Sequence, residues 1–148
     1  MKVLTFCLII LSKLLAAQLL TVNNLENLTQ SPLHHLDRKL ADHFSLKRNP
    51  AMEDKDNRVY SNDHSHENFK VLTVFINAKN CPALSLVTHN EAEINHFHTD
   101  LIKEGFMVSE YRDHHGKLFK KFVRDRFSVI IKKTDAPVPA HQVVWMCR

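Results

Sequence analysis

The sequence predicts an α/β protein with a mostly parallel sheet flanked by helices. Two observations lead to this prediction. Short apolar runs of the kind that form buried strands occur at residues 71–76, 106–111, 127–131 and 143–146. Residues with helical apolar spacing separate the first three runs, which gives the order β-α-β-α-β-β. Helical connections between successive strands favour parallel pairing.

Length and composition limit the chain to one soluble domain. It has 148 residues, of which 44% are hydrophobic and 24% charged, close to the usual globular proportions. Extensive disorder and fibrous repeats are therefore disfavoured. Only two glycines occur, Gly105 and Gly116, so the chain has no glycine-rich loop of the kind that binds nucleotide phosphates.

Residues 1–17 have the pattern of a signal peptide or hydrophobic leader. Lys2 precedes an apolar run, and the small residues Ala16 and Ala17 follow it. Lys13 interrupts the run, which disfavours a permanent transmembrane helix. The alternative is a hydrophobic helix that docks on the domain or on a partner. Asn27-Leu28-Thr29 is a sequon, so Asn27 is a glycosylation candidate if the chain enters the secretory path.

Residues 18–68 are interpreted as a polar, prodomain-like linker with one short helix. Ser31-Pro32 is a typical helix start, and apolar residues at helical spacing follow from Leu33 to Phe44. The stretch from Lys47 to Asn68 is polar and offers little to bury. These features place the folded unit at residues 69–148.

Within this unit, residues 71–76 predict a central strand and residues 77–87 a loop. Thr88 and Glu91 form a capping box, which predicts a helix from His89 to Glu104 that ends at Gly105. A second strand follows at residues 106–111. Asp113 is then expected to cap a second helix that buries Leu118, Phe119, Phe122 and Val123. Strands at residues 127–131 and 143–146 complete the unit.

Several segments from Tyr60 onward resemble the opening of the caspase large subunit. The matching positions are Phe75 and Asn77, Leu86 and Thr88, Phe97 and Leu101, Glu104 to Val108, Asp113, and Phe127 to Ile131. The resemblance implies a partial caspase-like three-layer fold over residues 69–148. It also implies the family activity of a cysteine endopeptidase and a cytoplasmic location.

The residues that carry catalysis in that family are replaced here. Val87 stands where caspases have a substrate-binding arginine, and a valine cannot bind a carboxylate. Lys132 and Lys133 occupy the place of the catalytic histidine. Cys147 matches only the Cys-Arg core of the nucleophile motif, so it is at most a nucleophile remnant and no catalytic residue is assigned.

These departures lead to the hypothesis of a truncated, catalytically inactive caspase-like protein. It would act as a modulator or decoy in apoptosis or innate immunity and pair with a caspase or adaptor as a homo- or heterodimer. Two alternatives stay open. One is a small secreted, histidine-rich binding protein, and the other is an incomplete chain of an active Asp-specific cysteine endopeptidase. The membrane would be contacted only through an uncleaved leader.

The sequence predicts no metal, cofactor or nucleic-acid site. Eleven histidines are many for this length, but His96 and His98 lack the spacing that places two ligands on one helix face. Glu93, His96 and Asp100 share one face of the predicted helix. Charged residues on the solvent side of an amphipathic helix explain this arrangement without a metal. The basic residues between Arg112 and Lys133 are interpreted as a solvated helix face, because no extra aromatic residues are interleaved for base stacking. Cys81 is interpreted as a buried or inert cysteine, with a reactive thiol as the alternative.

Overall fold

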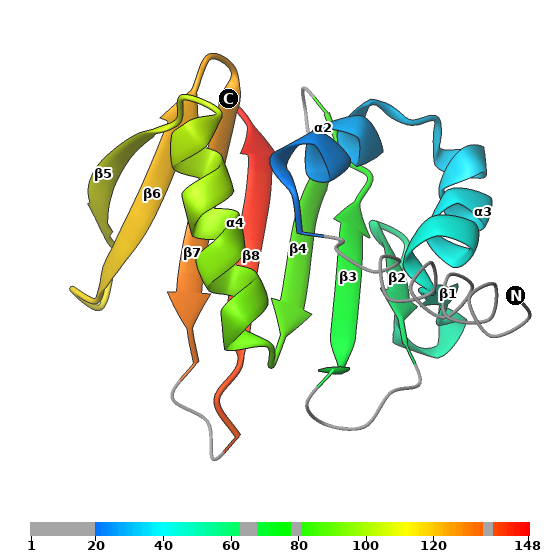
Figure 1. Ribbon diagram of the computed structural model, residues 1–148. Helices are drawn as coiled ribbons and strands as arrows, with labels where there is room; N and C mark the ends of the chain where they lie inside the picture. The colour runs from blue at the N-terminus through cyan, green and yellow to red at the C-terminus, as the bar shows by residue number, and fades with distance from the viewer. Residues whose placement is uncertain (1–19, 63–67, 78–80, 135–137) are drawn as a thin grey trace, which may run out of the picture.

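The computed structural model describes residues 20–62, 68–77, 81–134 and 138–148. Over these residues the chain forms one eight-stranded sheet in the order β1-β2-β3-β4-β8-β7-β6-β5. The strands are β1 (Lys47–Arg48), β2 (Asn57–Ser61), β3 (Lys70–Phe75), β4 (Ala83–Thr88), β5 (Met107–Arg112), β6 (Leu118–Arg124), β7 (Phe127–Lys133) and β8 (His141–Cys147). The helices are α2 (Val22–Gln30), α3 (Leu33–Phe44) and α4 (Glu91–Lys103), with a short 3-10 turn η1 at Pro50–Met52. Figure 1 shows the helices on one face of the sheet.

The sheet consists of two antiparallel meanders that meet at its centre. Strands β1 to β4 follow one another across one half of the sheet. Helix α4 then carries the chain over the sheet to β5 at the far edge (Figure 1). Strands β5 to β8 return stepwise to the middle, where β8 pairs with β4 and Val143 lies opposite Leu86.

The α/β class is confirmed, but the prediction of a mostly parallel sheet is wrong. Every pairing in the described sheet is antiparallel. The predicted helix after Asp113 is instead strand β6. Gly116, at φ 77°, and Asp125, at φ 48°, form tight turns on either side of β6, so β5, β6 and β7 are joined as hairpins. Hairpin connections allow only antiparallel neighbours.

The segment predicted as a loop at residues 77–87 contains a central strand. β4 pairs with β3 on one side and β8 on the other, and Leu84 and Leu86 are buried beneath the helices. The alternation of Leu84, Ser85, Leu86 and Val87 was too short to distinguish from an apolar loop. Pairing on both sides stabilises this strand.

The linker interpretation of residues 18–68 is also wrong where the structure describes them. α2 and α3 contribute Leu25, Leu28, Leu36 and Leu40 to the core, each at most 1% exposed. The polar stretch after Lys47 includes β2, whose Tyr60 is fully buried. A boundary at residue 69 would therefore cut through the core. The leader at 1–17 lies outside the described residues.

Several local predictions are confirmed. A helix follows Thr88, although its N-cap is Asn90, whose side chain accepts a hydrogen bond from the Glu93 amide at 3.0 Å. Gly105 has the predicted left-handed conformation, at φ 82°. The runs at 71–76, 106–111, 127–131 and 143–146 each coincide with a strand, except that Ile76 and Phe106 lie one residue outside β3 and β5.

Helix α3 is anchored to the sheet through Tyr60. Its buried side presents Leu36 and Leu40 to the core. The Tyr60 hydroxyl, reaching up from β2, donates to Asp37 on α3 at 2.7 Å. Burial, together with this bond to a carboxylate, raises the pKa of Tyr60 to about 12. The opposite side of α3 is thereby held toward solvent.

Candidate functional site

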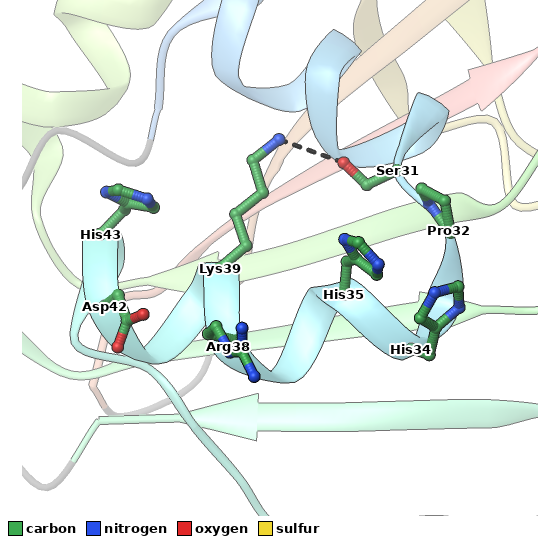
Figure 2. Close-up of a pocket in the computed structure, with 8 residues that line it drawn as sticks. All are labelled: Ser31, Pro32, His34, His35, Arg38, Lys39, Asp42 and His43. Carbon is green, nitrogen blue, oxygen red and sulfur yellow. Dashed lines mark hydrogen bonds between the residues drawn. The ribbon is translucent and has the colours of Figure 1, made fainter.

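A polar pocket of about 370 Å³ lies along the outer side of α3. It is lined by Ser31, Pro32, His34, His35, Arg38, Lys39, Asp42 and His43, which Figure 2 shows as sticks. All but the first two of these residues lie on α3, so a single helix and the turn before it build the site. Its volume falls within the range of roughly 300–1,000 Å³ typical of small-molecule sites.

The local sequence explains why these side chains gather on one face. His34, Arg38 and Asp42 are spaced four residues apart, and Lys39 and His43 continue the same spacing from His35. Because Leu36 and Leu40 turn inward, these two rows must face outward. Amphipathicity alone therefore creates a polar stripe at this position.

The turn between α2 and α3 closes one end of the pocket. Ser31 follows α2, and its hydroxyl donates to the Asn27 carbonyl at 2.6 Å. The Lys39 ammonium donates to the same hydroxyl at 3.1 Å (Figure 2). This hydrogen bond keeps the Lys39 ammonium next to the turn between α2 and α3, instead of leaving the side chain free in solvent. The His34 and His35 rings meet edge to face beside it, with centroids 4.2 Å apart.

The pocket carries an excess of positive charge. Arg38 and Lys39 contribute two permanent cations against the single carboxylate of Asp42. Three histidines add ring N–H groups to the lining. Guanidinium, ammonium and imidazole N–H groups all donate hydrogen bonds, so the arrangement is suited to an anion with several acceptor oxygens.

The same side chains do not form a metal site. Among the described residues no group of three or more histidine, cysteine, aspartate or glutamate side chains is arranged to hold a metal ion. Transition-metal sites need several such ligands converging on one point.

The structure separates the site residues suggested by the sequence. Cys147 forms a disulfide with Cys81, with their Cα atoms 5.9 Å apart. The reactive-thiol alternative for Cys81 is therefore wrong, and Cys147 in this form is no nucleophile, because a disulfide sulfur is not a thiolate. Val87 lies on β4, whereas Lys132 and Lys133 lie on β7. Asn27 is exposed on α2, and its glycosylation stays a prediction.

Polar residues of α4 that the sequence places near one another have separate structural surroundings. Glu93 is buried and forms an ion pair with Lys70 of β3 at 2.7 Å. Asp100 accepts a hydrogen bond from the Val22 amide at 2.8 Å and so joins α4 to α2. His96 is exposed, while His98 is turned into the helix–sheet interface. These residues form no shared site.

The basic stretch from Arg112 to Lys133 lies on strands, so its interpretation as a helix face is wrong. Arg124 illustrates the consequence: it bonds Glu26 of α2 at 2.9 Å and stacks over the Phe106 ring at 4.6 Å. Lys132 lies over the Phe119 ring. Alternation along a strand sends these cations to both sheet faces, which disperses the charge that a helix would have concentrated.

Sequence reasoning missed the α3 pocket. The apolar spacing in residues 33–44 predicts the helix, but it says nothing of the polar residues between the leucines. The signal was present, because His34 and Arg38, like His35 and Lys39, are four residues apart on a helix that was itself correctly predicted.

Two histidines at the helix–sheet interface have pKa values below the ordinary range. Burial is the main cause for both, and the positive charges of Lys120 near His98 and Lys133 near His141 add to it. The His98 ring packs edge-on against Phe122, with centroids 5.0 Å apart, and among the described residues its Nε2 atom is buried without a hydrogen-bond partner. The folded protein therefore favours neutral rings here.

Acidification from about pH 7.5 to about pH 5.5 is expected to lower the free energy of unfolding. The unfolded chain takes up protons on both histidines at their ordinary pKa, whereas the folded chain does so only at lower pH. Their stabilising contribution is thus complete above the ordinary pKa and lost below it. His98→Phe keeps the ring contact with Phe122 and should weaken the pH dependence measured by urea unfolding.

His96→Phe is the matched control for that measurement, because His96 lies on the same helix but is exposed. It should leave the pH dependence of stability unchanged. Equal slopes of stability against pH in the wild type and in His98→Phe would contradict the assignment.

Comparisons with known proteins add no family to this description. The chain matches no family model, no curated protein and no solved structure. None of the described helices has the length and apolar character needed to span a membrane. What the fold and the site define is an α/β protein with one antiparallel sheet, a helical layer on one face, and a basic, histidine-rich surface pocket on α3.

Proposed function

We propose that this protein is a small binding protein of an oxidising compartment that holds an anionic ligand in the α3 pocket. The observation that supports this most directly is that Arg38, Lys39 and three histidines line one hollow of about 370 Å³. Sulfate and phosphate groups, with several acceptor oxygens, suit such donors.

The disulfide supports the choice of compartment. Stable disulfides form in secreted and extracellular proteins and are rare in the cytosol. Cys81 and Cys147 join the end strands of the two meanders, near β4 and β8, so the bond would be structural. The signal-peptide pattern of residues 1–17 is consistent with the same compartment. Together these features favour the secreted, histidine-rich binding protein among the three hypotheses.

The caspase-modulator hypothesis has less support. It depended on a β-α-β order with parallel strands, whereas the described strands pair antiparallel and hairpins replace one of the two helical connections. The incomplete active endopeptidase loses support for the same reason, and Val87, Lys132 and Lys133 stand where that family has its substrate-binding and base residues. No contact among the described residues favours a cysteine protease.

Titration calorimetry with inorganic sulfate, inorganic phosphate and a sulfated disaccharide tests the proposal. We expect saturable binding, because the pocket cations and imidazole N–H groups donate hydrogen bonds to the anion. The double variant Arg38→Gln/Lys39→Gln should weaken binding by at least about tenfold, since it removes both permanent cations and their charge-assisted hydrogen bonds.

The matched control removes the same charge elsewhere. Lys55 and Lys103 are exposed lysines outside the pocket, and Lys55→Gln/Lys103→Gln should change the affinity by less than about twofold. An equal loss in both double variants would show that only the net charge attracts the anion. That outcome, or no saturable binding with any of the three probes, would overturn the proposed site.

A further inference from the structure

The two edges of the sheet differ in their capacity to accept another strand. β1 has only two residues, and the Arg48 guanidinium beside it is bound to Glu53 by bonds of 2.8 and 2.9 Å. β5 has six residues, every one of them exposed. Figure 1 shows β5 at the outer edge, on the side of the sheet away from α3. An exposed strand of this length is a template for pairing.

The hairpin at the end of β5 shows which backbone groups face outward. The Asp113 amide donates across the hairpin to the Lys117 carbonyl at 3.1 Å, so Asp113 is directed toward β6. Hydrogen bonding alternates along an antiparallel strand. Met107, Ser109 and Tyr111 therefore bond to β6, whereas Val108, Glu110 and Arg112 direct their N–H and C=O groups away from the sheet.

Exposed apolar side chains gather on the same hairpin. Met107 is 72% exposed, Val108 50%, Leu118 46% and Tyr111 39%. They account for half of the large hydrophobic side chains that are exposed in the described part of the chain. Soluble monomers seldom cluster such residues on an edge strand without a partner.

We propose that two copies of this chain pair antiparallel through β5, with the two-fold axis at Ser109. Met107 of each copy then lies opposite Tyr111 of the other, which forms two apolar cross-strand pairs. Val108 and Glu110 exchange backbone hydrogen bonds across the axis. The dimer is independent of any ligand at α3.

Charge favours this register over the neighbouring one centred on Glu110. Side chains that lie opposite each other must point to the same sheet face, so a two-fold axis passes through a residue rather than between two residues. An axis at Glu110 would place two glutamates directly opposite each other, which is destabilising. An axis at Ser109 places two small hydroxyl side chains there and avoids the repulsion.

The assembly closes at two copies. Since β1 has only two residues, β5 is the single long edge available among the described strands. A symmetric contact between β5 of one copy and β5 of the other uses this edge in both copies. No long edge then remains on which a filament could grow. The contact area is small, so the dimer is expected to dissociate on dilution.

Analytical ultracentrifugation of the full chain tests the dimer between about 10 μM and about 1 mM, a range that brackets weak association. The wild type should move from monomer to dimer. Glu110→Pro removes an outward N–H and no bond to β6, and proline is tolerated on strand edges, so this variant should stay folded and monomeric. Glu110→Ala loses the same side chain but keeps the N–H, and should still dimerise.

Crosslinking tests the register separately. In the proposed dimer the two Ser109 residues form a non-hydrogen-bonded pair with Cα atoms about 4.5 Å apart, within the range that a disulfide spans. In a Cys7→Ser background, Ser109→Cys should form a covalent dimer on mild oxidation, and Glu110→Cys should not. A wild type that remains monomeric throughout, an open series of larger species, or crosslinking through position 110 instead would overturn the proposal.

Discussion

Trp145→Ala is expected to lower the free energy of unfolding by about 3–5 kcal/mol, the range for truncating a large aromatic side chain in a core. Trp145 is fully buried on β8, near the centre of the sheet. Its ring centroid lies 5.7 Å from that of Phe106 and 5.2 Å from that of Phe127. Removing it empties the space between the sheet and α4. Urea unfolding followed by far-UV circular dichroism measures the loss, because the variant has no tryptophan left to report by fluorescence.

Trp145→Phe separates the loss of side-chain volume from the loss of the indole N–H. Among the described residues the indole nitrogen Nε1 is buried with no hydrogen-bond partner. Phenylalanine keeps most of the ring contacts and removes this unsatisfied donor, so its destabilisation should be clearly smaller than that of alanine. A Trp145→Ala variant as stable as Trp145→Phe would contradict the central role given to ring packing.

Removing the disulfide should have the second-largest effect. Cys81 and Cys147 are separated by 66 residues, and closing a loop of that length in the unfolded chain corresponds to about 4 kcal/mol, within an observed range of roughly 2–5 kcal/mol. Cys81→Ser/Cys147→Ser is therefore expected to lower the urea midpoint strongly while the antiparallel sheet is retained. The measurement is urea unfolding in the absence of reductant.

A reducing agent provides the control for this prediction. It should lower the urea midpoint of the wild type to that of the double serine variant and leave the variant itself unchanged. If reductant has no effect on the wild type, the two cysteines do not form a stabilising bond, and the proposed oxidising compartment loses its main support.

The candidate site could have been derived from the sequence more fully than it was. The helix at residues 33–44 was predicted from Leu36 and Leu40, and the outward rows of His34 with Arg38 and of His35 with Lys39 follow from the same periodicity. The contribution of Ser31 could not be derived, because its contact with Lys39 depends on the angle at which α2 leads into α3.

The error over β6 has a simple physical origin. Leu118, Phe119, Phe122 and Val123 fit a helical face, yet Phe119 and Phe122 are buried on opposite faces of a strand. Over so short a segment, apolar residues in adjacent pairs fit the 3.6-residue period of a helix as well as the two-residue period of a strand that is buried on both faces. The turns at Gly116 and Asp125, which depend on left-handed backbone conformations, resolved the ambiguity in favour of hairpins.

By itself the sequence determined the α/β class, helix α4, the left-handed stop at Gly105 and the location of four of the eight described strands, because each depends on neighbouring residues only. The tertiary structure decided the rest. Strand direction, the central position of β4 and the joining of Cys81 to Cys147 all bring together segments far apart in the chain. Local periodicity carries no information about such partners, since the same strand can pair on either side and in either direction until the whole core is assembled.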